Sequence, residues 1–219
     1  VRTYWVPGAY TVYLTVVDAD GSVEVLTRES AVVAVHYRGS YGTTRAGSAE
    51  GSNGLYGGPV LSGSGRYVAY DIDPGEPAQT GGGGGIRGVF VTDRLTGETV
   101  AASTGPGGAA ADGDSRYPAI SAHGRYVVFS SAAANLAPGD DNDRDDVFRH
   151  DLATGETMPA SLGVDGKWAN GDSTFASISG DGRFVAFDSE ASNLVAHDLN
   201  GKADVFVRDM PEGRTIRVS

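Results

Sequence analysis

Three segments of the chain share one pattern of glycine, arginine, aromatic and valine residues. They read PVLSGSGRYVAYD from residue 59, PAISAHGRYVVFS from residue 118 and ASISGDGRFVAFD from residue 176, so the spacings are 59 and 58 residues. A fixed period of this order is typical of repeat architectures, in which one unit cannot bury its apolar face alone and stacks on its neighbours. This repeat limits the possible folds more strictly than any single motif does.

Each repeat contains four short strand signals. They are a V/I-x-S step, the G-R-aromatic-V run, a V-F run (GVFVTD, DVFRHD, DVFVRD) and a Thr/Val run after a glycine turn. The aromatic residues of the second run are three positions apart, as at Tyr126 and Phe129, so they lie on opposite faces of a strand. A strand buried on both faces between neighbouring sheets accommodates them. We therefore expect an all-β fold of four-stranded antiparallel blades, a partial β-propeller, with blades at 59–103, 118–161 and 176–219.

The repeat also resembles a known family. The elements S-x-x-G-R-aromatic-V-x-F, then N-L (Asn135-Leu136 and Asn193-Leu194), then D-V-F-x-x-D and T-G-x-T are similar to the WD-like repeats of TolB-type β-propellers. The resemblance covers residues 43–219. Within it, TTRAGSAEGSNG (43–54) resembles the last strand and connector of a preceding unit, and in propellers such a leading strand often completes the last blade.

Three blades and one leading strand are too few for a closed ring, because propellers contain about four blades or more. Edges exposed at the two ends would favour aggregation if left uncovered. We therefore expect either further blades in the parent chain, beyond Ser219, or self-association of this chain.

The first 36 residues depart from the repeat. The stretch PGAYTVYLTVVDADGSVEVLTRESAVVAV predicts a hairpin around a D-A-D-G turn, followed by a further strand-like run. It resembles the C-terminal half of a polycystic-kidney-disease-type (PKD) domain, an Ig-like sandwich of extracellular proteins. The alternative is a degenerate blade. The expected domains are thus a short sandwich-like segment at 1–36 and propeller repeats at 37–219. The resemblance implies an extracellular or cell-surface location, with the periplasm as a further possibility.

Composition excludes several classes of partner and site. The formal net charge is −11, so a footprint for a nucleic-acid backbone is not expected. The chain has no cysteine, which excludes disulfides and thiolate metal sites. No run approaches about 18 consecutive apolar residues, so no membrane span is expected. Absence of cysteine together with an acidic balance fits a secreted bacterial protein.

Two acidic loops are the strongest candidates for a ligand site. Both follow the spacing D-x-N-x-x-x-D, in GDDNDRDD and in HDLNGKAD. Calcium takes about six to eight oxygen ligands, partly from carboxylates at alternate loop positions, and this spacing offers them. The alternative is that Asp and Asn cap turns through backbone amides, and that the last Asp opens the third strand. The first repeat has TGGGGGIRG instead and predicts no site. The candidate calcium ligands are Asp140, Asn142, Asp146, Asp198, Asn200 and Asp204.

Other repeated charges indicate structural roles. Arg66, Arg125 and Arg183 begin the second strand of every unit, and an acidic residue recurs with them, which indicates an ion pair within each blade. Asp114 and Asp172, in the connectors, are expected to hydrogen-bond strand ends of adjacent blades.

The sequence contains none of the catalytic templates that we considered. There is no G-x-S-x-G elbow and no H-E-x-x-H motif, and the G-x-G-x-x-G at 83–88 is not followed by a helix. No catalytic or cofactor-binding residue is therefore assigned, and an enzyme is the less favoured interpretation. We expect a non-catalytic binding or scaffold module, with a protein or glycan ligand on the loop face or in the central channel. The alternatives are the propeller portion of a secreted hydrolase or lyase, and a purely structural array.

Overall fold

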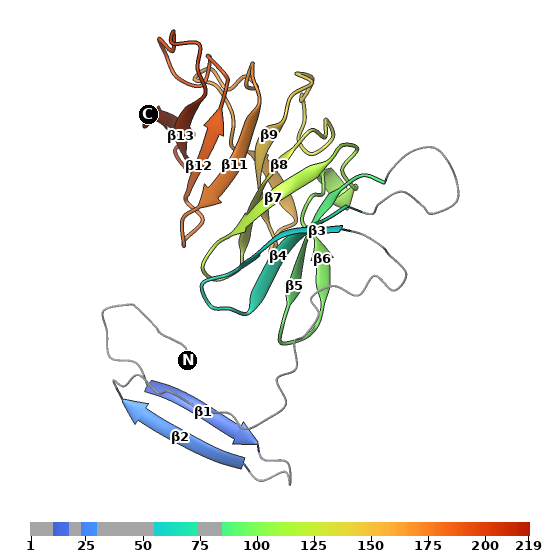
Figure 1. Cartoon of the computed structure of the whole chain (residues 1–219), viewed down its shortest axis with the longest axis vertical. Coiled ribbons are helices and arrows are strands. Elements are labelled where there is room, and N and C mark those ends of the chain that lie inside the picture. Colours follow the sequence, from blue (N-terminus) through green and yellow to red (C-terminus); the bar gives the residue numbers. More distant parts are fainter. Residues whose placement is uncertain (1–10, 18–22, 30–54, 74–84) are drawn as a thin grey trace. The chain divides into compact units, whose positions relative to one another are not determined.

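A computed structural model describes residues 11–17, 23–29, 55–73 and 85–219 (Figure 1). The chain divides into two compact units, residues 1–44 and 45–219. Among the described residues, no helix is both long enough and apolar enough to cross a membrane.

The first unit contains an antiparallel hairpin. Strand β1 (Thr11–Val17) pairs with β2 (Val23–Glu29), with Thr11 opposite Glu29. The hairpin expected from the sequence is thereby confirmed, whereas the resemblance to a PKD domain stays a prediction. Residues 30–36, with the further strand-like run, and 43–54, with the expected leading strand, lie outside the described residues.

The second unit contains three four-stranded antiparallel sheets, each with its strands in chain order. The only helix among the described residues is a short 3-10 turn, η1 (Pro106–Gly108). This arrangement confirms the all-β fold and the blades of a partial propeller. The first sheet is formed by β3 (Leu55–Leu61), β4 (Tyr67–Asp73), β5 (Gly88–Asp93) and β6 (Thr99–Ala101), the second by β7 (Ser115–Ile120), β8 (Tyr126–Ser131), β9 (Asp146–Asp151) and β10 (Glu156–Pro159), and the third by β11 (Ser173–Ile178), β12 (Phe184–Ser189), β13 (Asp204–Asp209) and β14 (Arg214–Arg217).

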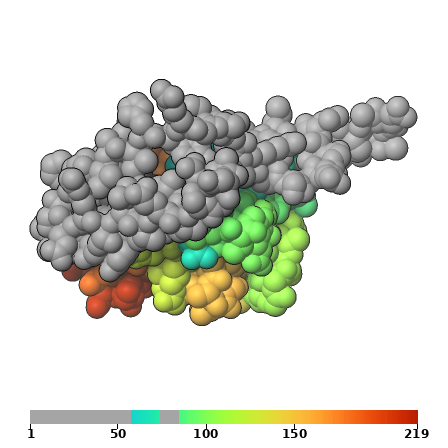
Figure 2. All heavy atoms as spheres, turned by 90° about the horizontal axis from the view of Figure 1, so that it is seen from below, coloured from blue at the N-terminus to red at the C-terminus, as the bar shows by residue number. Residues whose placement is uncertain are grey.

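The core lies between neighbouring sheets rather than within one sheet. Val89 and Val91 of the first blade belong to the same buried cluster as Phe129 and Phe148 of the second. A second cluster joins Val147 and its neighbours to the side chains of the third blade. Strand β8 is buried on both faces, as the aromatic spacing predicts. Figure 2 shows, from below, described residues of all three blades packed against one another.

The S-x-x-G-R-aromatic motif forms the turn between the first and second strands. Ser121 Oγ accepts the N–H of Tyr126 at 3.0 Å, and Gly124 has φ of 80°. The ring of Tyr67, from the preceding blade, lies where a β-carbon on Gly124 would be. Glycine is therefore required here twice, by the left-handed backbone and by the approach of the neighbouring blade.

The arginine of the motif closes each blade at this end. Arg125 Nε and Nη2 donate to both carboxylate oxygens of Asp151 at 2.8 to 3.1 Å, and its guanidinium lies 4.9 Å from the centroid of the Tyr126 ring. Such bidentate pairs fix geometry as well as adding energy. The structural ion pair expected from the sequence is confirmed in all three blades, as Arg66–Asp93, Arg125–Asp151 and Arg183–Asp209.

The connectors fasten successive blades at the opposite end. Asp114 Oδ1 accepts the N–H of Arg87, at the start of β5, at 2.9 Å. Asp172 Oδ1 accepts the N–H of Asp145, before β9, at 3.3 Å. Each connector thus binds the blade that precedes it, and the role predicted for these aspartates is confirmed.

The outer face of the third blade is open. Val147 and Ala160 of the second blade are fully buried against the third. The residues one repeat later, Val205 and Val218, are 36% and 57% exposed. The same sheet face is therefore covered in the second blade and uncovered in the third.

The two faces of β12 allow a direct test of this packing. Phe187 is 1% exposed and lies in the cluster between the second and third blades, whereas Phe184 is 41% exposed. We expect Phe187→Ala to lower the free energy of unfolding by about 3 to 5 kcal/mol, since it leaves a cavity in the core. Phe184→Ala is the matched control and should cost clearly less. Urea unfolding of both variants measures the difference, and equal losses would contradict a core placed between the sheets.

Candidate functional site

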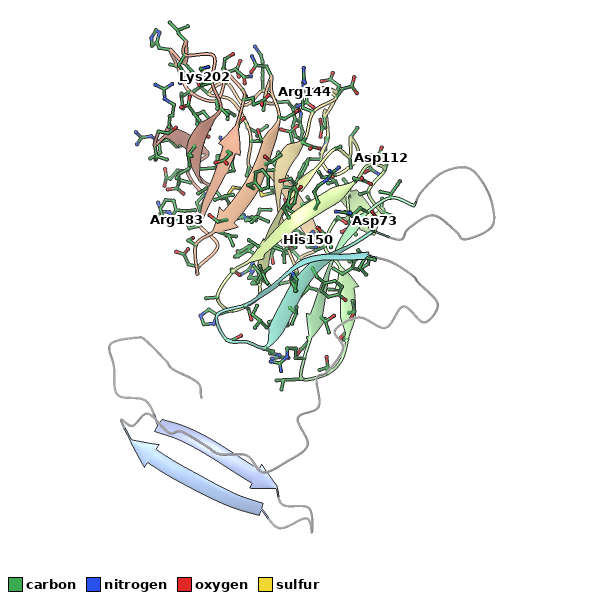
Figure 3. The ribbon with its side chains drawn as sticks, viewed as in Figure 1. Asp73, Asp112, Arg144, His150, Arg183 and Lys202 are labelled. Atoms are coloured by element: carbon green, nitrogen blue, oxygen red, sulfur yellow. The ribbon has the colours of Figure 1, made fainter. Side chains whose placement is uncertain are left out.

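Antiparallel pairing gathers two kinds of loop at one end of the sheets, the loop between the second and third strands and the connector between successive blades. Ser115 lies opposite Ser131, and Ser131 lies opposite Asp146, so the start of the first strand, the end of the second and the start of the third coincide. The segment after the fourth strand returns to the same end. In Figure 3, Arg144 and Lys202 mark this end of the second and third blades, and Arg183 marks the other end of the third.

Charge is distributed unequally between the two ends. The described loops at the first end are 85–87, 102–114, 132–145, 161–172 and 190–203, and we call this the acidic end. It carries ten acidic and four basic side chains. The loops at the opposite end, 62–66, 94–98, 121–125, 152–155, 179–183 and 210–213, carry three acidic and four basic ones. The side chains of the acidic end are Asp112, Asp114, Asp140, Asp141, Asp143, Asp145, Asp165, Asp172, Glu190 and Asp198, with Arg87, Arg144, Lys167 and Lys202.

The second-blade acidic loop brings two of its three predicted ligands into contact. Asn142 Nδ2 donates to Asp146 Oδ2 at 2.7 Å, and Ser161 Oγ donates to Asp146 Oδ1 at 2.5 Å. Asn142 Oδ1 accepts the N–H of Arg144 at 3.0 Å, which is an Asx turn. Asp146 also begins β9. Asn142 therefore forms a turn, as the alternative prediction states.

The third-blade loop repeats these contacts and adds a cation. Asn200 Nδ2 donates to Asp204 Oδ2 at 2.7 Å, and Ser219 Oγ donates to Asp204 Oδ1 at 2.8 Å. Arg217 Nη1 lies 2.9 Å from Asp198 Oδ1 and 3.5 Å from Asp204 Oδ2. A guanidinium therefore bridges the two carboxylates that were predicted to bind a metal ion.

The two loops differ electrostatically although their sequences correspond. Burial raises the pKa of Asp140 to about 6 and that of Asp146 to about 7. The pKa of Asp204 is lowered by hydrogen bonds from Asn200 and Ser219 and by the charge of Arg217. Position 159, one repeat before Arg217, is a proline. In the third blade, Arg217 pairs with Asp198 and Asp204. The second-blade loop holds the corresponding carboxyl groups, Asp140 and Asp146, without an arginine at that position.

The donor set of the second-blade loop suits a hard cation chemically. Carboxylate and amide oxygens are the ligands that calcium takes in proteins. Among the residues that the structure describes, no group of three or more His, Asp or Glu side chains is placed to hold a metal ion. The first blade has Gly88 at the position of Asp146. Calcium binding by these loops stays a prediction.

Sequence reasoning missed two aromatic residues on the inner strands. Tyr117 on β7 and Phe175 on β11 are 44% and 61% exposed, and their ring centroids are 4.8 Å apart. Both lie where the pairing with the second strand is irregular, and both have positive φ, 56° and 53°. An aromatic residue directly before the PAIS and ASIS steps was the available signal.

A depression of about 470 Å³ lies at the end opposite to the acidic end, between the first and second blades. Its wall includes Tyr67 and Gly124, which pack on each other, and Asp93 and Arg125. Both charged groups belong to the ion pairs that close the blades.

Comparison with known proteins gives structural likenesses at low sequence identity. No protein-family model matches the sequence, and no curated protein matches it. TolB from Acinetobacter baumannii is 16% identical, with a TM-score of 0.46, over 96% of this chain and 41% of that one. A protein assigned as TolB from Agrobacterium tumefaciens is 12% identical, with a TM-score of 0.45, over 76% of this chain and 62% of that one. An acylaminoacyl peptidase from Pyrococcus horikoshii is 12% identical, with a TM-score of 0.46, over 75% of this chain and 25% of that one. The chain thus spans less than two thirds of each of these proteins.

Opposite pKa shifts at corresponding positions predict opposite pH responses. The folded-state pKa of Asp146, about 7, lies above the ordinary value of 3.8, so the folded protein holds this proton more tightly than the unfolded chain. Its contribution therefore lowers the free energy of unfolding as pH rises from about 4 to about 7. Asp146→Asn removes this titration and should flatten the profile in that range.

Asp204→Asn is the matched control. Its folded-state pKa is lowered, so Asp204 stabilises the fold above its unfolded pKa, and this stability is lost only as pH falls through the folded value. The substitution should therefore destabilise the protein at neutral pH without flattening the profile. Urea unfolding between about pH 5 and about pH 8 tests both, and parallel profiles for wild type and Asp146→Asn would contradict the assignment.

Proposed function

We propose that this chain is a non-catalytic propeller module that binds a protein or glycan partner through the loops of its acidic end. The observation that carries the proposal is the unequal charge of the two ends. One end presents ten acidic and four basic side chains in its loops, and the other presents three and four. Strongly one-sided charge steers association with a complementary partner and suppresses binding of unsuitable ones.

The use of the repeated charges supports a binding rather than a catalytic role. The arginines that recur in every blade are paired with the third-strand aspartates, and the connector aspartates accept backbone N–H groups. These groups are occupied in holding the blades together. Exposed side chains such as Asp141 and Asp143 lie instead on the loops of the acidic end, and ligands commonly bind to loops on rigid scaffolds.

The proposal includes a location outside the cytoplasm, at the cell surface or in the periplasm. It is supported by the resemblance of the N-terminal segment to extracellular sandwich domains and by the absence of cysteine.

The proposal also includes a partner for the open face of the third blade. Val205 and Val218 are exposed where the second blade is covered, so a further blade or a second copy would bury them.

Binding through the acidic end is tested on protein and glycan arrays with the intact chain and with an Asp141→Asn/Asp143→Asn variant. Both side chains lie on the exposed surface of the second-blade loop. We expect at least one ligand whose binding weakens in the variant and at higher salt, because the interaction is electrostatic. Ligands bound equally by both proteins would contradict the acidic end as the binding face.

We further propose that calcium binds the second-blade loop through Asp140, Asn142 and Asp146. The third-blade residues Asp198, Asn200 and Asp204 are the weaker candidates, because Arg217 already pairs with both carboxylates. The raised pKa values of Asp140 and Asp146 support this choice, since a bound cation would compensate their buried charge.

Thermal unfolding with calcium and with a chelator tests the site. Calcium at about 100 times its dissociation constant should stabilise the fold by roughly 2.7 kcal/mol. Asp140→Asn should abolish the response. Asp198→Asn, the corresponding change in the third blade, should lower the midpoint through the loss of its ion pair but leave the calcium response intact. Overlapping curves for the wild type would show that the loops only form turns.

A further inference from the structure

We propose that Tyr117 and Phe175 form the contact surface for a cationic side chain, Lys or Arg, on an extended segment of a partner protein. This inference rests on the proposed binding function and names the residues and the chemistry of the ligand. The two rings lie on the inner strands of adjacent blades, two residues after the strands begin at the acidic end.

The backbone at both positions is strained. Values of φ near +55° are uncommon for any residue except glycine and are outliers for bulky side chains. The corresponding residue of the first blade, Gly58, does not have a positive φ, so this conformation is confined to the second and third blades among the described residues. Strain of this kind persists where surrounding structure imposes it, and it concentrates at functional sites.

Burial does not account for the two aromatic side chains. Tyr117 and Phe175 are among the exposed apolar residues of the described chain, whereas the residues that follow them, Pro118 and Ala176, are buried. Their rings contact each other at a centroid distance of 4.8 Å with an interplanar angle of 33°. A β-carbon placed on Gly58 would have no atom within 4 Å, so the surface is open at the first-blade position. The pair is therefore an exposed aromatic surface beside free space.

One carboxylate contacts the backbone of Tyr117, and others stand at the start of the two inner strands. Asp71, only 1% exposed, accepts the N–H of Tyr117 with Oδ2 at 3.2 Å, and its Oδ1 has no hydrogen-bond partner among the described residues. Asp114 and Asp172 directly precede the two inner strands. The pKa of Asp145 is raised by burial and by these two carboxylates, against the opposing charge of Arg116.

The basic side chains nearby do not neutralise this charge. Arg116 Nη2 lies 3.4 Å from Asp114 Oδ2, and Arg144 Nη1 lies 3.8 Å from Asp172 Oδ1. Arg87, which is also close to Asp71, pairs with Asp73, so each of these cations is already engaged with a carboxylate. With ten acidic and four basic side chains on the loops, the end keeps an excess of negative charge. A cation approaching the rings is therefore attracted.

Aromatic rings beside carboxylates fit a cationic ligand better than an anionic or neutral one. A guanidinium or ammonium within about 6 Å of a ring face is attracted by the ring quadrupole. The chain already uses this contact internally, because Tyr126 has Arg125 at 4.9 Å and Arg149 at 4.5 Å from its ring centroid. The net charge of −11 adds long-range attraction for a basic segment.

The test uses a fluorescent peptide of alternating Gly and Arg, with a Gly-Ser peptide of equal length as the probe control. Each is titrated by fluorescence anisotropy against the intact chain and against Tyr117→Gly, Phe175→Gly and the double variant. We expect affinity for the Arg peptide to weaken with salt and to fall about tenfold in the double variant. Phe184→Ala, which removes an exposed aromatic at the other end, should bind like the wild type.

Thermal unfolding separates a binding role from a structural one. Glycine relieves the positive φ at both positions, so the midpoint of the double variant should equal or exceed that of the wild type. A fall as large as that of Phe187→Ala would show that the rings are structural and would overturn the inference.

Further outcomes distinguish the inference from the proposed function. Equal affinity of the Arg peptide for the wild type and the double variant would remove the rings from the site and leave binding by the acidic loops standing. Loss of an array glycan in the double variant, without any binding of the Arg peptide, would replace the cationic ligand by a sugar. If every ligand found on the arrays binds equally well to the wild type, to the Tyr117/Phe175 double variant and to the Asp141/Asp143 double variant, the inference and the proposed function are both overturned.

Discussion

The contact between the aromatic face of one sheet and the valine face of the preceding sheet supports every other feature of the repeat unit. Phe129 and Phe148 pack with Val89 and Val91, and the third blade repeats the arrangement. A single four-stranded sheet of this kind would expose both apolar faces, so it depends on neighbours for stability. The same contact fills the interior with side chains that carry no charge. Many ionisable groups lie at the two ends of the sheets, whereas His150 and Arg208 are buried within β9 and β13.

The two ends use their charges differently. At one end, each arginine lies over the aromatic residue that follows it and pairs with the aspartate that ends the third strand, so that charge is locally balanced. At the other end, the excess of carboxylates is balanced only in places. Asp146 and Asp204 show how little is needed to change this balance. They make the same contacts with asparagine and serine, yet burial raises the pKa of Asp146, whereas these hydrogen bonds and, less strongly, the charge of Arg217 lower the pKa of Asp204.

The sequence predicts those features that recur in every repeat. The sheets, the arginine–aspartate pairs and the connector contacts all follow from positions that return at a fixed spacing, because a periodic residue marks a periodic contact. Features that do not recur in every blade were not predictable in this way. The bridge from Arg217 to Asp198 joins the fourth strand to a loop that is distant in sequence. The conformation of Tyr117 and Phe175 depends on an irregular register, and such a register leaves no clear trace in hydrophobic alternation. The metal role of the acidic loops depends on a cation as well as on residues, and spacing alone cannot separate ligands from turn formers.

Gly58, Tyr117 and Phe175 occupy the same position in three successive blades, and the difference among them separates architecture from function. The glycine adopts its place in the inner strand without a side chain, so the fold does not require an aromatic residue there. A left-handed conformation costs a non-glycine residue about 1 to 2 kcal/mol. The exposed rings return only part of that, because an aromatic pair contributes about 0.5 to 1.5 kcal/mol beyond its buried area. The position lies outside the contact between sheets, so it can vary without disturbing the core. A repeat scaffold of this kind can therefore acquire a binding surface one blade at a time. At the acidic end, this chain has aromatic residues at two positions of positive φ where glycine would be the least strained residue.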